Sequence, residues 1–457
     1  MTKRYRVAAL VGLAVVISAC TSSADPTSTV AIGLPDAPAT AVTPTPATAQ
    51  SVYDQVAASI ASIDTDIAGG SGILIDPSTV LTAAHVVWPY DEVRVVFPNG
   101  TEVRDAPVVG SDLFGDLAII DVSGTPNLPA PVAIGDGESL PLGSPVYLVG
   151  YPGESESFPE PTITEGILSR TREWEAGEWT FLQSDASVAG GQSGGALVDE
   201  DGQVIGITNF SFLEEFGLSG SLTDASAAIG RMRAGTPTGG LTSRLPPAPN
   251  GTDFFEFEFD TMWEDSIYVF EEPLYSEVSF DASSDGDVTL TLGTIDGIEI
   301  ASVDETTEGE ERIEELISYA GPHIVRVESL SAPGAVRLRS NVKLTPWPDP
   351  DDGRTLTRTS TIIGNADYPG DYDWYLVDLG KGQAITIDVD AITFDPVLMI
   401  DGPDGLGYLE AIDDDSGGGI FGTNPRVVFT AREAGTFYVV VGDNNSSGPG
   451  AYRLSVD

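Results

Sequence analysis

Short runs of β-branched and aromatic residues recur along this chain from about residue 51 onward, and Gly, Pro, Asn or Asp bounds each run. Runs of this length and spacing are typical of strands in β-sandwiches and barrels. The sequence contains 51 Gly and 32 Pro, which agrees with many tight turns, and its hydrophobic fraction of 41% is sufficient for several cores. The sequence therefore predicts an all-β protein.

Two stretches rich in Pro and Gly divide the chain at residues 237–251 and 345–354. They separate three expected folded blocks, which cover residues 51–236, 252–344 and 355–457. Three domains are also what 457 residues predict at roughly 150 residues per domain.

The first 19 residues have the pattern of a signal peptide, because a positively charged start precedes an uncharged, mostly apolar run over 7–19. That run is too short to span a bilayer as a permanent helix. It ends in Ile-Ser-Ala-Cys, which resembles a bacterial lipobox, so Cys20 is the expected site of lipidation. An ordinary secretory signal with an incidental cysteine is the alternative. Residues 20–50 are rich in Thr, Ala and Pro and are expected to form a disordered tether.

Acidic residues outnumber basic ones by 70 to 21, which gives a formal net charge of −49. Such a surface repels phosphate backbones and anionic headgroups, so it excludes nucleic-acid binding and polybasic membrane binding. The acidic residues are spread over all three blocks, which favours adaptation to the surroundings, such as a saline habitat, over one acidic binding site. The single cysteine excludes an internal disulfide and a Cys-rich zinc site.

Three polar residues of the first block combine into one kind of chemistry. His85 follows an apolar strand and two alanines, Asp116 directly precedes another apolar strand, and Ser193 lies between two pairs of glycines. A serine nucleophile needs a base such as histidine, and a carboxylate can hold the tautomer of that histidine. Asp112 is the rival candidate for the carboxylate. Taken singly, each residue has an ordinary explanation: a structural histidine, a solvated strand end and a Gly-rich hairpin.

The glycines around Ser193 allow the backbone to turn tightly and to direct amide N–H groups to one point. An oxyanion hole requires this arrangement, and the N–H groups of Gly191 and Ser193 are the expected donors.

The segments around these residues resemble the trypsin-like serine protease superfamily. Several motifs are similar to its HtrA/Deg branch, namely residues 81–87, 115–119, 164–169, 183–186 and 202–207. The resemblance covers essentially all of residues 51–236. It implies a chymotrypsin-like double β-barrel, in which Ser193 attacks the scissile carbonyl, His85 transfers the proton and Asp116 orients His85.

The same resemblance places Ser187 at the floor of the primary specificity pocket. A neutral residue at that position argues against Lys/Arg specificity and favours apolar side chains. Gln192 stands where digestive trypsins have an aspartate, so activation by a freed N-terminus is not expected. The loop around Gly190 is also looser than the HtrA pattern, so it could be inactive until it is remodelled.

Residues 252–457 carry an internal repeat. Strand-like residues from Glu277 correspond to those from Ala384, 107 residues later, and the segment that begins at Gly334 corresponds to the one at Gly450, 116 residues later. Alternating patterns in both copies predict β-sandwiches. The second copy resembles the bacterial pre-peptidase C-terminal (PPC) domain, and the first is similar to a degenerate PPC domain. The resemblance implies a role in binding or stability rather than chemistry.

Clustered aspartates in the second copy could supply hard oxygen ligands for calcium, although such clusters are also common in solvated turns. The second histidine, His323, has no nearby ligand residues in the sequence and is interpreted as structural. The calcium candidates are Asp371, Asp373, Asp413, Asp414 and Asp415.

The sequence thus predicts a serine endopeptidase that needs no cofactor, acts on polypeptides outside the cytoplasm and is lipid-anchored to the bacterial cell membrane. A secreted enzyme is the alternative location. The alternative function is a non-catalytic cell-surface binding protein, in which the protease fold is a scaffold and the β-sandwiches adhere to a ligand.

Overall fold

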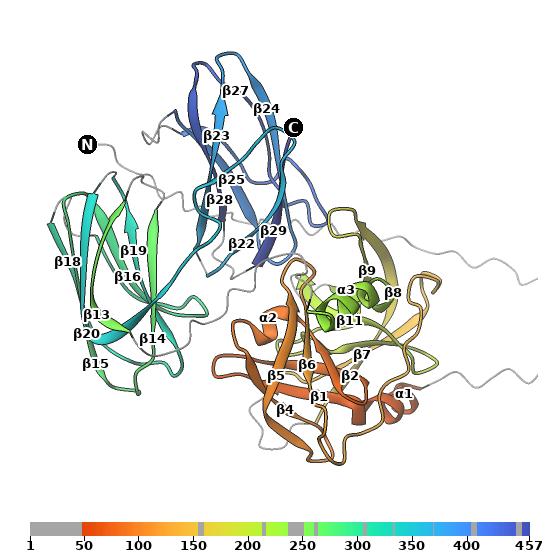
Figure 1. The fold of residues 1–457 in the computed structure, drawn as a ribbon. Helices are drawn as coiled ribbons and strands as arrows, with labels where there is room; N and C mark the ends of the chain where they lie inside the picture. The colour runs from red at the N-terminus through yellow and green to blue at the C-terminus, as the bar shows by residue number, and fades with distance from the viewer. Residues whose placement is uncertain are drawn as a thin grey trace, which may run out of the picture. The chain divides into compact units, whose positions relative to one another are not determined.

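The computed structural model describes residues 48–457, apart from the masked internal segments that end this paragraph. Strands make up most of the described chain, and its helices are short (Figure 1). The predicted signal peptide, Cys20, most of the tether and nearly all of the first linker lie outside the described residues. The segments left out are 154–159, 213–215, 236–250, 260–263, 305–308, 332–333, 369, 404–408 and 445–449.

The described part of the first block begins with helix α1 (Ala49–Val56), which starts inside the segment predicted to be a tether. Thr48 and Ser51 form a capping box, in which each side chain accepts a hydrogen bond from the backbone N–H of the other. These bonds satisfy two N–H groups that a helix start leaves unpaired, so the helix begins before residue 51.

Two closed barrels make up the body of the first block, which confirms the predicted chymotrypsin-like double barrel. Both barrels have the same strand order, β1-β2-β3-β6-β5-β4 in the first and β7-β8-β9-β12-β11-β10 in the second. The strands of the first are β1 (Ile60–Asp64), β2 (Gly69–Asp76), β3 (Thr79–Thr82), β4 (Glu92–Val96), β5 (Glu102–Asp112) and β6 (Leu117–Asp121). Those of the second are β7 (Pro145–Gly150), β8 (Thr162–Trp174), β9 (Trp179–Ser184), β10 (Ala196–Asp199), β11 (Val204–Phe212) and β12 (Phe216–Ser221).

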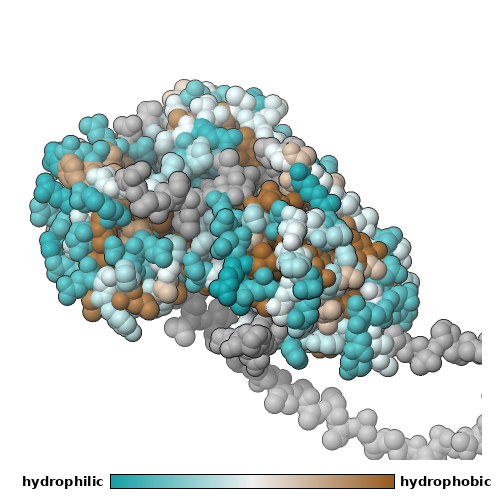
Figure 2. Space-filling model, turned by 60° about the horizontal axis from the view of Figure 1, so that its bottom comes forward, coloured by the Kyte–Doolittle hydropathy of each residue, from teal (hydrophilic) through white to brown (hydrophobic). Residues whose placement is uncertain are grey.

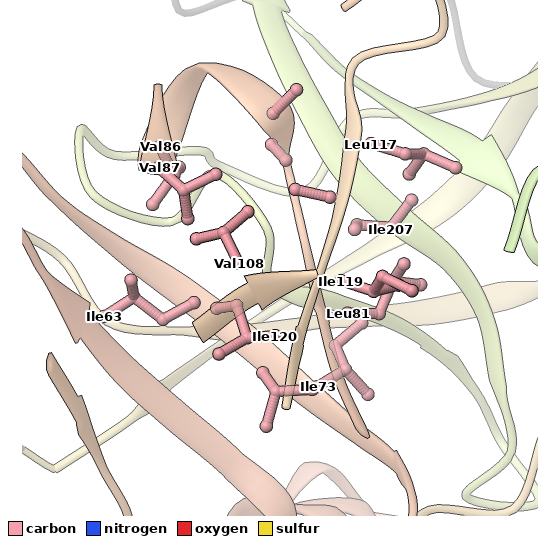
Figure 3. Close-up of a cluster of buried hydrophobic side chains, with 14 of the residues drawn as sticks. Ile63, Ile73, Leu81, Val86, Val87, Val108, Leu117, Ile119, Ile120 and Ile207 are labelled. Carbon is pink, nitrogen blue, oxygen red and sulfur yellow. The ribbon is translucent and has the colours of Figure 1, made fainter. Parts of the chain in front are cut away.

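Side chains from different strands of the first barrel meet in one core. Ile63, Ile73 and Leu81 are fully buried there and point toward a common interior (Figure 3). The remaining helices are η1 (Ala57–Ser59), which directly follows α1, and α2 (Ala84–Val87) and α3 (Leu222–Arg233), which pack against the barrels.

The middle block is a sheet that folds over its own core. The first part of its long strand β20 pairs with β13 and β15, and the last part pairs with β14. Buried residues of both halves, such as Leu338 and Val325, belong to one hydrophobic cluster. The strands are β13 (Thr252–Phe259), β14 (Asp265–Phe270), β15 (Glu277–Ser284), β16 (Val288–Thr294), β17 (Glu299–Val303), β18 (Gly309–Leu316), β19 (His323–Ser329) and β20 (Gly334–Trp347).

The last block has two sheets, with strand orders β21-β23-β28-β25-β26 and β22-β29-β24-β27. A buried core that includes Tyr375, Ile387 and Tyr452 draws on both sheets. The strands are β21 (Arg354–Thr355), β22 (Thr361–Ala366), β23 (Tyr372–Leu379), β24 (Ala384–Ala391), β25 (Pro396–Asp401), β26 (Leu409–Asp413), β27 (Arg426–Thr430), β28 (Gly435–Asp443) and β29 (Gly450–Val456).

The middle and last blocks share their topology strand for strand. The order β17-β16-β19-β14 of the middle block corresponds to β26-β25-β28-β23, and β13-β20-β15-β18 corresponds to β22-β29-β24-β27. The repeat inferred from two short segments therefore extends over eight strands of each block among the described residues.

The described surface reflects the acidic composition. Hydrophilic residues cover much of the face that Figure 2 shows, with smaller hydrophobic areas between them. Among the described residues, the helices are all too short or too polar to cross a membrane.

Candidate active site

His85 lies where β3 passes into helix α2. β3 is buried along its whole length, and the neighbouring side chains Val86 and Val87 pack into the barrel core (Figure 3). Because adjacent residues of a helical turn point in different directions, burial of Val86 and Val87 leaves His85 partly exposed. The His85 side chain keeps 35% of its surface accessible.

Asp116 lies between β5 and β6 and is fully buried. Both of its carboxylate oxygens are 3.0 Å from Nδ1 of His85, and Oδ1 also accepts the backbone N–H of His85 at 3.0 Å. When Nδ1 carries the proton, its N–H donates a hydrogen bond to this carboxylate, and Nε2 is left as an acceptor. The ring is therefore arranged to take a proton at Nε2.

The electrostatics of the pair favour a charged imidazole. Burial alone lowers the pKa of His85, but the charge and hydrogen bonds of Asp116 outweigh it and raise the pKa above the ordinary value of histidine. A carboxylate in this position stabilises the imidazolium that forms when the ring accepts a proton.

The rival carboxylate, Asp112, has a different partner. It is buried at the end of β5 and accepts the backbone N–H of Gly115 at 3.0 Å. Burial raises its pKa to about 6. Of the two aspartates considered from the sequence, the structure brings Asp116 to the ring of His85.

Asn209 on β11 is a contact of this pair that the sequence reasoning missed. Its side-chain N–H₂ donates to Oδ2 of Asp116 at 3.1 Å and to the carbonyl of Asp116 at 2.9 Å. Its Oδ1 accepts the backbone N–H of Gly220 at 3.0 Å, which fixes the direction of the amide. An asparagine in an apolar strand, Ile-Thr-Asn-Phe, was the available signal, since a buried amide needs partners.

Ser193 lies in a turn that packs against strand β2 of the first barrel. Its carbonyl accepts the backbone N–H of Ser71 on β2 at 2.8 Å. A Cβ added to Gly70 would lie 2.5 Å from Val86 and 3.2 Å from the carbonyl oxygen of Ser193, so the serine turn and the histidine turn flank the same glycine. The structure thus places Ser193 beside the turn that carries His85.

Gly191 and Gln192 belong to the same loop as Ser193. Gly191 has a φ of +87°, a left-handed conformation that favours glycine. Gln192 is buried, and its side chain accepts the N–H of Ala189 and donates to the hydroxyl of Thr162 on β8. Gln192 therefore ties the loop to the second barrel.

Ser187, the predicted pocket floor, is exposed between β9 and Ser193. Its carbonyl accepts the hydroxyl of Thr164 at 2.8 Å. The next residue, Val188, packs so closely against Gly217 on β12 that a Cβ at Gly217 would lie 2.6 Å from a Val188 methyl group. An apolar side chain thus borders the predicted floor.

Two carboxylates of the last block and one of the preceding linker converge to a spacing that suits a cation. One oxygen from each of Asp349, Asp371 and Asp373 lies within 4.8 Å of the others. Asp371 and Asp373 are buried. Oδ1 of Asp373 has no hydrogen-bond partner among the described residues, whereas its Oδ2 accepts the hydroxyl of Tyr452 at 2.5 Å. Burial and then neighbouring carboxylates raise the pKa of Asp349 to about 7 and hold those of Asp371 and Asp373 well above their usual range. Buried oxygens that lack enough donors fit a hard cation such as Ca²⁺.

The remaining calcium candidates lie elsewhere in that block. Oδ2 of Asp413 accepts the backbone N–H groups of Ser416 and Arg426 and the hydroxyl of Ser416. Asp414 and Asp415 are exposed. Among the described residues, the group with metal-binding spacing includes the predicted Asp371 and Asp373 and adds Asp349, but not this second cluster.

His323, interpreted as structural, is fully buried at the start of β19 and stacks on Phe270 at a ring-centroid distance of 5.4 Å. It lies in the core of the middle block.

Two family models match parts of this chain. Residues 70–207 match the family model of the trypsin-like peptidase domain, and residues 371–443 match that of the bacterial pre-peptidase C-terminal domain. The second match covers part of the last block, so the interpretation of the middle block as a degenerate copy rests on the shared topology.

Three relatives illustrate the similarity of the first block. The "Serine endoprotease DegS" of Salmonella typhimurium is 36% identical over 147 residues, which cover 31% of this chain and 40% of the relative. The "Serine protease Do-like HtrB" of Bacillus subtilis is 36% identical over 147 residues, covering 30% and 31%. The "Probable periplasmic serine endoprotease DegP-like" of Brucella suis is 38% identical over 149 residues, covering 32% and 28%.

A solved structure described as "HtrA-type protease AlgW with tripeptide" is 27% identical, has a TM-score of 0.37 and covers 41% of this chain and 65% of its own. The chain spans two fifths or less of the length of the three curated relatives. On the sequence matches, this chain contains a trypsin-like peptidase domain of the HtrA/DegS type and a C-terminal PPC domain.

Proposed function

We propose that this protein is a serine endopeptidase that cleaves polypeptides through Ser193, His85 and Asp116. The observation that carries the proposal is the contact of Asp116 with Nδ1 of His85 beside the turn of Ser193. In the proposed reaction, the Ser193 hydroxyl attacks the scissile carbonyl while Nε2 of His85 takes its proton. The imidazolium then protonates the leaving amine. In the second half of the reaction, water attacks the acyl-enzyme while His85 takes its proton, and His85 returns that proton to the oxygen of Ser193.

The N–H groups of Gly191 and Ser193 would bind the negative oxygen of the tetrahedral intermediate. The neutral Ser187 and the neighbouring Val188 support a preference for apolar side chains before the cleaved bond. A cleavage profile of a peptide library tests this preference, and dominant cleavage after Lys or Arg would contradict it.

The decisive test compares wild type with Ser193→Ala. We expect wild type to cleave unfolded casein and to react with a fluorophosphonate at Ser193. The variant should lose casein cleavage by a factor on the order of 10⁶ in kcat and should not be labelled at position 193. Ser226→Ala is the matched control, because Ser226 lies on α3 and its hydroxyl donates to the carbonyl of Thr223 in the same helix. Casein cleavage that survives in Ser193→Ala would refute the proposal and favour the non-catalytic binding protein.

We propose that the enzyme works outside the cytoplasm, anchored by a lipid on Cys20. The signal-like start of the sequence supports this location, and one relative is named a periplasmic protease. A palmitate analogue fed to an expressing bacterium should label wild type but not Cys20→Ser. Equal labelling of both would contradict the anchor, and an unlabelled protein in the medium would support the secreted alternative.

We further propose that the last block binds Ca²⁺ through Asp349, Asp371 and Asp373. The buried, unpaired oxygen of Asp373 supports this site. Ca²⁺ at about 100 times its Kd would stabilise the folded state by about 2.7 kcal/mol. We therefore expect EDTA to lower the melting temperature of wild type but not that of Asp373→Asn.

Asp378→Asn is the matched control for calcium, because Asp378 lies on the same strand but is exposed. That variant should respond to EDTA as wild type does. A melting temperature of wild type that EDTA leaves unchanged, together with no heat of Ca²⁺ binding in calorimetry, would rule out the site.

A further inference from the structure

One buried residue of the first barrel holds the loop that carries Ser193. The backbone N–H of Ser71 donates to the carbonyl of Ser193 at 2.8 Å, and its hydroxyl donates to the carbonyl of Gly191 at 2.9 Å. The same hydroxyl accepts the backbone N–H of Tyr151 at 2.8 Å. Ser71 is fully buried, so its three hydrogen bonds do not compete with water.

The direction of each proposed oxyanion donor is set by the carbonyl of its own peptide group. In a trans peptide, the C=O and the following N–H point in opposite directions. The carbonyl of Gly190 accepts the N–H of Gly153 at 2.6 Å, and the carbonyl of Gln192 accepts the N–H of Gly195 at 2.9 Å. These two bonds therefore fix the directions of the N–H groups of Gly191 and Ser193.

Both donors are available in this arrangement. Among the described residues, the N–H groups of Gly191 and Ser193 have no hydrogen-bond partner, so their directions do not depend on a group that a substrate must displace. Ser71 bonds the carbonyls of Gly191 and Ser193. These carbonyls belong to the next peptide groups along the chain, which carry the N–H groups of Gln192 and Gly194 and not the two oxyanion donors.

The close packing of the loop supports the same arrangement. A Cβ at Gly191 would lie 2.5 Å from the backbone nitrogen of Gly153, and a Cβ at Gly194 would lie 2.1 Å from the carbonyl oxygen of Ser71. Both glycines have positive φ, +87° and +78°. The loop thus packs directly on the residues that bond it, which resists rotation of its peptide groups.

We propose that Ser71 is a positioning residue that presets the oxyanion loop, so that the enzyme acylates Ser193 without an activating partner. The inference rests on the proposed peptidase function. The loop before Ser193 is looser in sequence than the HtrA pattern, and its contacts with Ser71, Gly153 and Thr162 supply the order that the loop sequence does not.

The positioning role is tested with Ser71→Ala. This variant removes the hydroxyl's bonds to the Gly191 carbonyl and the Tyr151 N–H but retains the backbone bond to Ser193. We expect kcat on a chromogenic peptide to fall roughly 10- to 100-fold with KM within about twofold, below the 10²–10³-fold loss typical of deleting an oxyanion donor. Binding of a peptide aldehyde, whose adduct places an oxyanion in the hole, should weaken by a similar factor.

Ser59→Ala is the matched control, because Ser59 is also buried and its hydroxyl donates to a backbone carbonyl, that of Ala130. It should lose stability without losing kcat. Gly153→Pro is a second variant, which removes the N–H donor to Gly190 on an exposed segment and should lower kcat without loss of folding. Equal kcat values in Ser71→Ala and Ser59→Ala, at equal folded fraction, would overturn the role of Ser71.

Presetting is tested by fluorophosphonate labelling of the full chain with no peptide present. Labelling of Ser193 under these conditions supports the proposal. Casein cleavage that depends on Ser193, without labelling of the peptide-free protein, would overturn presetting and leave the peptidase function standing. If the protein neither cleaves casein nor is labelled, the peptidase function itself is overturned, and the inference falls with it.

Discussion

The pairing of His85 with Asp116 depends on an unusual backbone conformation at the aspartate. Asp116 has a φ of +52°, and Asp and Asn are the residues other than glycine that adopt this region most readily. Asn209 bonds both the carbonyl and the carboxylate of Asp116, and so holds the backbone and the side chain together. Asparagine suits this role because one amide group supplies two N–H donors.

The charge of Asp116 predicts a pH effect. The proposed base works only when His85 is neutral, so kcat/KM should fall as the pH falls below the pKa of His85. Asp116 raises that pKa, so Asp116→Asn should move this acid limb to lower pH while kcat drops by roughly 10⁴-fold. The measurement is the pH profile of kcat/KM on a chromogenic peptide.

Asp112→Asn is the control for this profile, since burial raises the pKa of Asp112 to about 6 and could place its titration in the same range. We expect Asp112→Asn to leave the acid limb of the kcat/KM profile at the same pH as in wild type. A limb that moves in Asp112→Asn but not in Asp116→Asn would assign the titration to Asp112 and contradict the role given to the His85–Asp116 pair.

At the scale of elements, both barrels use one strand order to deliver different parts of the site. β3 leads into the turn of His85, and the loop of Ser193 precedes β10. The sequence predicted these segments because each is a short apolar run beside Gly or small residues. It did not predict the contacts of Ser71 and Asn209, since an isolated serine or asparagine on a strand has no pattern that indicates its partner.

The repeat of the last two blocks was visible in the sequence only in part. The strands of the two blocks are hard to match by sequence, because many of them share the same alternating pattern. That pattern shows that one face of a strand is buried, but not where the strand lies in the sheet. The pairing of β20 with β13 and β15 matches that of β29 with β22 and β24, and only the folded chain reveals this shared topology. Whether the middle block is a degenerate PPC domain stays a prediction that this topology supports.

For the whole molecule, the net charge of −49 predicts a dependence of stability on salt. Like charges at the surface repel one another in the folded state, and this repulsion is screened within about 3 Å at 1 M salt against about 10 Å at 0.1 M. We therefore expect the melting temperature to rise by several degrees between 0.1 and 1 M KCl at pH 7. The shift should be smaller at pH 5, where more carboxylates are protonated, and a melting temperature that falls with KCl would contradict the prediction.

The sequence by itself determined the all-β class and the residue types that a serine nucleophile requires. These follow from local patterns, because strand alternation, turn residues and short motifs are properties of neighbouring residues. Only the tertiary structure decided that Asp116 rather than Asp112 contacts His85, that Ser71 and Gly153 hold the serine loop, and that Asp349 joins Asp371 and Asp373. Those contacts join residues that are distant in sequence, and closure of the barrels and pairing of the strands bring them together.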